Sequence, residues 1–182
     1  MIDYGYVGEG PVSSGINEGF ALRAITYNAE ENYEACDVEF IRDEKVVRDR
    51  LFAPNGNKPR DKEDQETAKK REIGDFNNKM RSYLTNFVTN EKITETFKIK
   101  KPQSFKDLVN LYSSLLPVDS IDKKGRLLMW YKSSGYLEVP KYTSINNAKK
   151  LFSIDEDEDL ELKKNYQDRL IKPEQKDKES FL

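Results

Sequence analysis

The sequence predicts a mainly β fold with a helical insertion, and three observations indicate it. Hydrophobic and polar residues alternate over much of residues 17–52, as in strands with one buried face. Hydrophobic residues then recur at helical spacing between residues 73 and 116. Two further strand-like runs, residues 126–131 and 136–139, flank a short turn sequence. The predicted order is therefore three strands, a helical segment and two strands.

Composition excludes several chemistries. The 182 residues include no histidine, so a Ser-His-Asp or Cys-His catalytic arrangement is impossible. The one cysteine, Cys36, cannot form an internal disulfide or a structural zinc cluster. We therefore expect a protein that is not an enzyme and needs no cofactor or metal. No apolar run reaches the ~18 residues of a membrane span, and no signal sequence is evident, so we expect no membrane partner and a cytoplasmic location.

Three segments differ in composition. Residues 1–16 are rich in glycine and small residues and are expected to form a flexible N-terminal arm. Residues 17–150 contain the predicted strands and helices and form the folded domain. Residues 151–182 form an acidic tail that begins with the run at 155–159. The tail also carries a predicted amphipathic helix, whose apolar residues are spaced four apart: Leu162, Tyr166 and Leu170.

The first three strands are predicted over residues 17–27, 33–41 and 45–52. In the first strand the inward face changes between Ala24 and Ile25, which predicts a β-bulge or a strongly coiled strand. The inward residues of the second strand are Cys36, Val38 and Phe40. In the third strand, Asp49 shares the inward parity of its apolar neighbours, which is the weak point of that assignment.

The helical segment is predicted to hold two helices. The first covers roughly residues 64–90, with charged early turns and an apolar second half. The second begins at Ser104, which forms a capping-box pattern with Asp107, and it is stopped by Pro117. Residues 93–99 between them are predicted to be extended. This arrangement predicts a five-stranded OB-like barrel with helices between strands 3 and 4. The alternative is an α+β layer, with helices covering one face of an antiparallel sheet.

Aromatic rings and cations interleave along the last two predicted strands and the loop after them. Rings can stack on unpaired bases, worth ~1–3 kcal/mol per base, while cations follow the phosphates. In an OB barrel, strands 2 and 3 and the loops joining strands 1–2 and 4–5 form the binding face. The candidate stacking residues are Phe52, Tyr131, Tyr136 and Tyr142. The candidate phosphate-binding residues are Arg48, Arg50, Lys98, Lys100, Lys132 and Lys141.

The aromatic candidates also have a structural interpretation. Trp130 lies in an apolar run, which is typical of a core residue. Tyr131 and Tyr136 fit an ordinary cross-strand aromatic pair. A solvated lysine face equally explains the lysines near residue 100.

The arginine candidates have a structural interpretation as well. Arg48 and Arg50 lie on the outward face of the third strand. Two acidic residues of the second strand, Asp37 and Glu39, can pair with them across the sheet. The loop at residues 28–32 carries two glutamates, which would repel a phosphate backbone.

The chain resembles phage-encoded single-stranded DNA-binding proteins, which are OB-fold proteins that coat DNA during replication and recombination. The resemblance covers about residues 15–150. It rests on the element order, the charged helical middle, and the sequences GINE at 15–18 and SGYLEVPKY at 134–142. It implies a non-enzymatic protein that binds single-stranded DNA with little sequence preference, in the host cytoplasm. The same chemistry suits RNA.

The C-terminus is similar to the acidic tails by which such proteins recruit replication proteins. Phe181 and Leu182 would then be the partner-binding residues. The acidic run at 155–159 lies well upstream, however, and lysines are mixed into the last residues. A tail of this charge is also expected to be able to cover a basic groove when it is empty.

Two other functions compete with this interpretation. One is a protein-interaction or virion-structural docking module, whose arm and tail would contact neighbouring subunits in a homo-oligomer. The other is a nuclease that holds Mg²⁺ with carboxylates. No spacing in the sequence gathers two or three acids with a lysine, which disfavours the nuclease.

Overall fold

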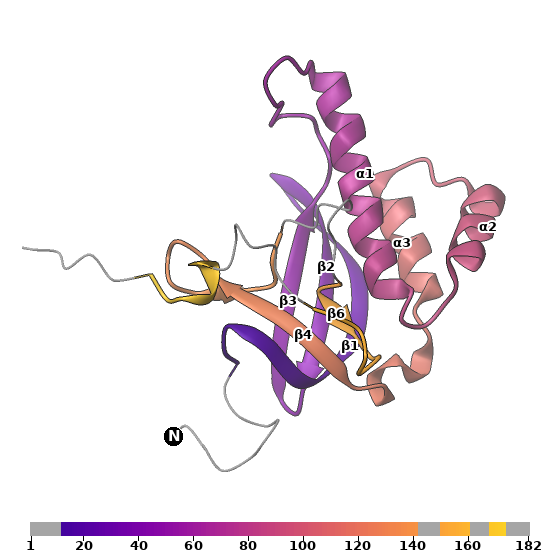
Figure 1. Ribbon diagram of the computed structural model, residues 1–182. Helices are drawn as coiled ribbons and strands as arrows, with labels where there is room; N and C mark the ends of the chain where they lie inside the picture. The colour runs from indigo at the N-terminus through magenta and orange to yellow at the C-terminus, as the bar shows by residue number, and fades with distance from the viewer. Residues whose placement is uncertain (1–11, 142–149, 161–167, 174–182) are drawn as a thin grey trace, which may run out of the picture.

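The computed structural model describes residues 12–141, 150–160 and 168–173, and Figure 1 shows their arrangement. The strands are β1 (Gly15–Glu30), β2 (Tyr33–Arg42), β3 (Lys45–Phe52), β4 (Gly125–Tyr131), β5 (Leu137–Glu138) and β6 (Phe152–Ser153). The helices are α1 (Gln65–Leu84), α2 (Asn90–Lys100) and α3 (Phe105–Leu115), followed by the 3₁₀ helix η1 (Val118–Asp122). The prediction of a β-rich fold with helices between the third and fourth strands is confirmed.

The six strands form one antiparallel sheet in the order β3-β2-β1-β4-β5, with β6 also paired to β4. The long strand β1 serves two neighbours: residues 15–20 pair with β4, and residues 21–30 pair with β2. Within the described residues, β3 and β5 lie at the two ends of this order and are not paired with each other. The sheet is therefore open at this point, where the predicted barrel would be closed.

The predicted irregularity in β1 is a β-bulge. The register between β1 and β2 shifts between Leu22 and Ala24. The extra residue changes which side chains point inward, so Leu22 and Ile25 are both buried. A bulge also increases the local twist. The bulge lies just after the point at which the partner of β1 changes from β4 to β2.

Residues 93–99 are helical rather than extended, so that prediction is wrong. They belong to α2, which begins after Thr89, whose side chain accepts a hydrogen bond from the backbone N–H of Lys92. Ile93 and Phe97 lie one turn apart on the inward side; Ile93 is buried, and the Phe97 ring lies 5.3 Å from that of Tyr112 on α3. The alternating threonines and lysines suggested a strand, but the two apolar residues set the helical period.

The other two helices begin close to their predicted starts, and α3 has the predicted cap at Ser104. Asp64 accepts a hydrogen bond from the Thr67 N–H at the start of α1, and Ser104 accepts one from the Asp107 N–H at the start of α3. The helix α1 ends at Leu84, earlier than predicted. No helix of the described residues has both the length and the apolar character that crossing a membrane requires.

The folded unit extends beyond residue 150, where the acidic tail was predicted to begin. Leu151, Phe152 and Leu160 are buried, and the Phe152 ring packs 5.1 Å from that of Phe40 on β2. Residues 168–173 lie against the β4–β5 hairpin, where the Arg169 Nε donates to the Tyr131 carbonyl at 2.9 Å. The predicted boundary therefore falls inside the core, and the strand β6 belongs to the sheet.

Candidate nucleic-acid interface

A groove of about 490 Å³ lies between β3 and β5. One wall consists of residues 45–50 and Phe52 of β3. The other consists of Lys132, residues 137–139 and Lys141, with Val12 and Met129 completing the lining. The groove therefore occupies the place where the sheet is open.

Positive charge predominates along this groove. The basic residues that line it are Lys45, Arg48, Arg50, Lys132 and Lys141, and the acidic ones are Asp49 and Glu138. Within the described parts of the chain, neither Lys45 nor Lys141 makes an ion pair, whereas the Lys132 Nζ lies 3.5 Å from Glu138. Four of the six residues predicted to bind phosphate, two from β3 and two from around β5, thus line one groove together with Phe52.

Asp49 forms a buried polar cluster behind the β3 wall. Its Oδ2 atom accepts hydrogen bonds from the Lys79 Nζ at 2.8 Å and from the Tyr83 hydroxyl at 2.7 Å, both on α1. All three side chains are buried. Burial and the adjacent carboxylate raise the pKa of Tyr83, which stays a hydrogen-bond donor. The inward parity of Asp49 is thus explained by this cluster.

The same cluster connects the two walls of the groove. The Lys79 ammonium also donates to the Pro140 carbonyl at 2.9 Å, just after β5. One buried side chain of α1 therefore contacts both β3 and the segment following β5. No ladder joins β3 to β5 within the described residues, so Lys79 provides a polar link between the two groove walls.

The predicted ion pairs of Arg48 and Arg50 are present. Asp37 accepts two hydrogen bonds from Arg50, at 2.7 and 2.9 Å. Glu39 accepts from Arg48 at 2.8 Å and from Arg23 of β1 at 2.6 Å. Hydrogen bonds from the arginines lower the pKa of both carboxyl groups, which remain ionised. Any phosphate at Arg48 or Arg50 would have to compete with these carboxylates.

Phe52 presents an exposed ring at the end of β3. It is 56% exposed, and the Tyr33 ring meets it edge to face at 5.7 Å. The guanidinium of Arg50 lies over the Tyr33 ring at 5.4 Å. Tyr33 was not among the predicted site residues, although it shares the outward parity of Asp37 and Glu39 in β2.

The rings of the β4–β5 hairpin lie outside the groove lining. Tyr131 is half-buried, and Tyr136 is 75% exposed in the turn region. Trp130 is a core residue, as its apolar context indicated, and is only 1% exposed. Its Nε1 donates to Glu138 at 3.1 Å, and the Arg169 guanidinium covers its ring at 4.3 Å.

The remaining predicted residues are not part of this groove. Lys98 and Lys100 lie on α2, which Figure 1 shows on the opposite side of the molecule from the β4–β5 hairpin. Tyr142, Phe181 and Leu182 lie outside the described residues. The glutamates of the β1–β2 turn do not line the groove either.

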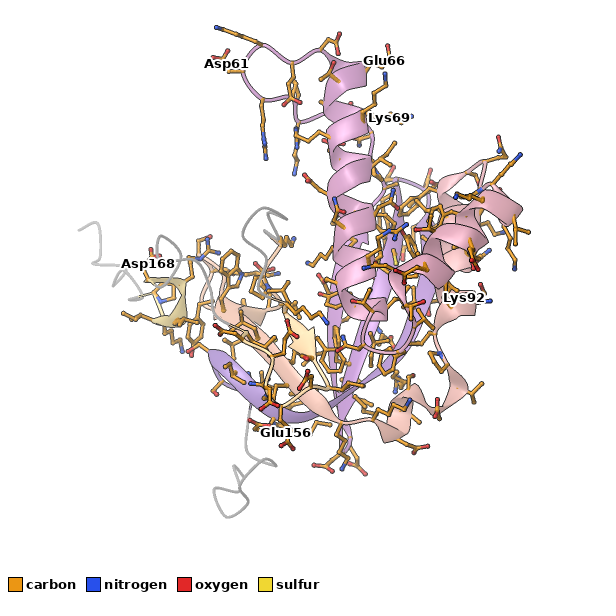
Figure 2. All side chains as sticks on the ribbon, turned by 45° about the vertical axis from the view of Figure 1, so that its right-hand side comes forward. Asp61, Glu66, Lys69, Lys92, Glu156 and Asp168 are labelled. Carbon is orange, nitrogen blue, oxygen red and sulfur yellow. The ribbon has the colours of Figure 1, made fainter. Side chains whose placement is uncertain are left out.

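The acidic run at 155–159 lies away from the groove. Arg126 of β4 donates to the carbonyl oxygens of Asp155 and Glu158, which fastens the run beside β6. Figure 2 shows Glu156 at the lower end of the molecule, and no residue of this run lines the groove. Where the structure describes the chain, no three potential metal ligands among its His, Cys, Asp and Glu residues gather.

Comparison with protein-family models, with curated proteins and with solved structures finds no match to this chain. The chemistry of the groove is therefore the basis for a functional assignment.

Proposed function

We propose that the protein binds single-stranded nucleic acid, DNA in the first place, along the groove between β3 and β5. The observation that supports this proposal is the alignment of five cations and one exposed ring beside an open sheet edge. The sequence resemblance to proteins of DNA replication and recombination favours DNA over RNA.

We also propose that the sheet is an OB-like barrel, opened between its third and fifth strands. In support, β1 pairs with both β2 and β4 and the helices lie between the third and fourth strands. An OB fold binds oligonucleotides through the face of strands 2 and 3 and the adjoining loops. The groove contains β3 and the first residue of the loop between β4 and β5.

Different residues of the groove contact the phosphates and the bases. Lys45 and Lys141, which have no carboxylate partner among the described residues, contact phosphates first. The exposed Phe52 ring stacks on an unpaired base. Arg48 then exchanges its carboxylate for a phosphate. Because phosphates and ring faces are common to all nucleotides, this binding has little sequence preference, and because Phe52 needs an unstacked base, it selects single strands.

The test is a titration of fluorescently labelled oligo-dT with the full chain, repeated at rising salt and with duplex DNA as competitor. We expect the logarithm of the binding constant to fall with the logarithm of salt concentration, with a slope of ~−0.7 per phosphate neutralised. Phe52→Ala should weaken binding by ~5- to 150-fold, the equivalent of one stacked base. Ile99→Ala, an exposed apolar residue on α2, is the matched control and should have no effect.

The proposal fails if the wild-type chain does not bind oligo-dT at low salt, or if binding is insensitive to salt. It also fails if duplex DNA competes as well as single strands do.

A protein-docking module remains a second candidate, favoured by the free edge of β3. Among the described strands β3 pairs only with β2, so the backbone groups on its outer side are available to an extended segment of a partner. Lys45, Arg48 and Arg50 along this edge would repel the same strand of a second copy. Gel filtration and a pull-down in the absence of nucleic acid distinguish this function from the first.

A further inference from the structure

A helical projection rises from the body of the molecule directly after β3. It consists of residues 53–72, that is, the loop after β3 and the first turns of α1. Figure 1 shows that β3 leads to the base of this projection, and that the projection extends beyond the sheet and the other helices. Figure 2 places Asp61 at its tip and Glu66 and Lys69 on the first turns of the helix.

The loop is fastened to the helix by a carboxylate. One oxygen of Glu72 accepts hydrogen bonds from the Gly56 N–H at 2.8 Å and the Asn55 N–H at 3.1 Å. Gly56 has a φ of +72°, and a Cβ there would collide with the carbonyl oxygen of Gln65. Only glycine fits this position, so the loop has a specific conformation.

Three further acidic residues of the projection also have partners within it. Glu63 accepts from the Arg71 Nε at 3.1 Å and from the Arg60 N–H at 2.8 Å. Asp64 caps α1, and Glu66 lies 3.6 Å from Lys70 in an ion pair. Of the carboxylates in this segment, only that of Asp61 has no partner among the described residues.

The basic residues of the projection are used differently. Four of them are exposed and make no ion pair with any residue that the structure describes: Lys58, Arg60, Lys62 and Lys69. The sequence of the segment is almost balanced in charge, but Glu63 and Glu72 are partly buried in the loop contacts. Five basic residues (Lys58, Arg60, Lys62, Lys69 and Lys70) are exposed against three acidic ones (Asp61, Asp64 and Glu66), so cations predominate on the surface of the projection.

We propose that this projection extends the path of the single strand beyond the groove, with its cations contacting the phosphates. The inference rests on the proposed function. Phe52 ends the groove wall and Lys58 follows six residues later, and Figure 1 shows the chain leading directly from β3 into the projection. The projection exposes cations and offers no exposed ring, which fits contact with the phosphate backbone and not with bases.

The test compares oligo-dT lengths across the ~4–16 nucleotides that an OB fold occupies. The variant carries Lys58→Gln, Arg60→Gln and Lys62→Gln, and the matched control carries Lys92→Gln, Lys106→Gln and Lys124→Gln, which removes the same charge elsewhere. With the projection variant, we expect the shortest oligonucleotide to bind as it does to the wild type. The longest should bind about tenfold more weakly, and its salt slope should shrink by ~0.7 for each phosphate that the variant no longer neutralises.

The outcomes separate the two proposals. If the wild type binds no oligonucleotide of any length, the proposed function fails, and this extension with it. If the wild type binds but the projection variant matches the control at every length, or is weakened equally at every length, only the extension is overturned. All six substituted residues are exposed, and urea unfolding of each variant verifies that it remains folded.

Discussion

Glu39→Gln should strengthen nucleic-acid binding, although it removes two ion pairs. Glu39 holds Arg48 at 2.8 Å and Arg23 at 2.6 Å on the outward face of the sheet. Of these two arginines only Arg48 lines the groove, and its side chain is 49% exposed. A phosphate that approaches Arg48 must displace the carboxylate. The amide of glutamine has nearly the same shape but no charge, so it competes less.

The magnitude follows from the energy of the pair that is displaced. Exposed ion pairs contribute ~0.2–1 kcal/mol. If Arg48 no longer has to give up this contribution, the affinity rises by up to about fivefold. Arg48 neutralises the same phosphate in both proteins, so the salt slope should stay nearly unchanged while the affinity rises. Asp37 is a poorer position for this test because Asn28 and Arg50 also depend on it.

The assay is fluorescence anisotropy of labelled oligo-dT at several salt concentrations. Glu95→Gln is the matched control, because it removes one exposed carboxylate from α2 on another face of the molecule. Equal affinity gains in the two variants would mean that only net charge matters. A weaker affinity of Glu39→Gln than of the wild type would refute the idea that the carboxylate competes with phosphate.

Three further predictions concern stability and reactivity. Lys79→Met leaves the buried carboxylate of Asp49 without its cation, so urea denaturation should show a free energy of unfolding lower by ~3–5 kcal/mol. A double variant that adds Asp49→Leu should recover most of this loss, whereas an unchanged midpoint in the single variant would contradict the role of the pair. Because the pKa values of Asp37 and Glu39 are lowered in the fold, their ionised forms stabilise it above the usual carboxyl pKa of ~4. This stabilisation should disappear as the pH falls through the lowered values, and constant stability in urea unfolding from neutral pH down to pH 2 would contradict the contribution of these two ion-paired carboxylates. The Cys36 thiol is fully buried, and this burial is the main cause of its raised pKa, so the thiol should be alkylated only as fast as the protein unfolds. Mass spectrometry measures this rate, and rapid labelling of the native protein would show that the β2 core opens locally.

Local features of the fold were predictable because they depend on neighbouring residues. Ser104 satisfies the N–H of Asp107 three residues later, and the bulge in β1 follows from a change of parity within the strand. The helix α2 was missed because its alternating polar residues matched a strand, while the partner of Phe97 lies on another helix. The opening between β3 and β5 depends on contacts between distant segments, such as Lys79 with Pro140, which no local pattern reveals.

The candidate site was predictable in part for the same reason. Outward parity correctly placed Arg48, Arg50 and Phe52 on one face of β3, because alternation along a strand is a local property. The position of Lys98 and Lys100 followed from the packing of α2 on α3, which the sequence does not display. The basic surface of the projection was not predictable, because the segment has a nearly neutral composition. Only the fold shows that carboxylates such as Glu72 and Glu63 accept hydrogen bonds within the loop instead of pairing with the exposed lysines.

Amide chemical shifts of isotope-labelled protein, recorded while oligo-dT is added, locate the bound strand residue by residue. A strand that lies between β3 and β5 should shift the amides of residues 45–52 and 137–139, with smaller changes in α2. Shifts confined to α2 or to the acidic run at 155–159, with β3 and β5 unchanged, would contradict this location for the ligand.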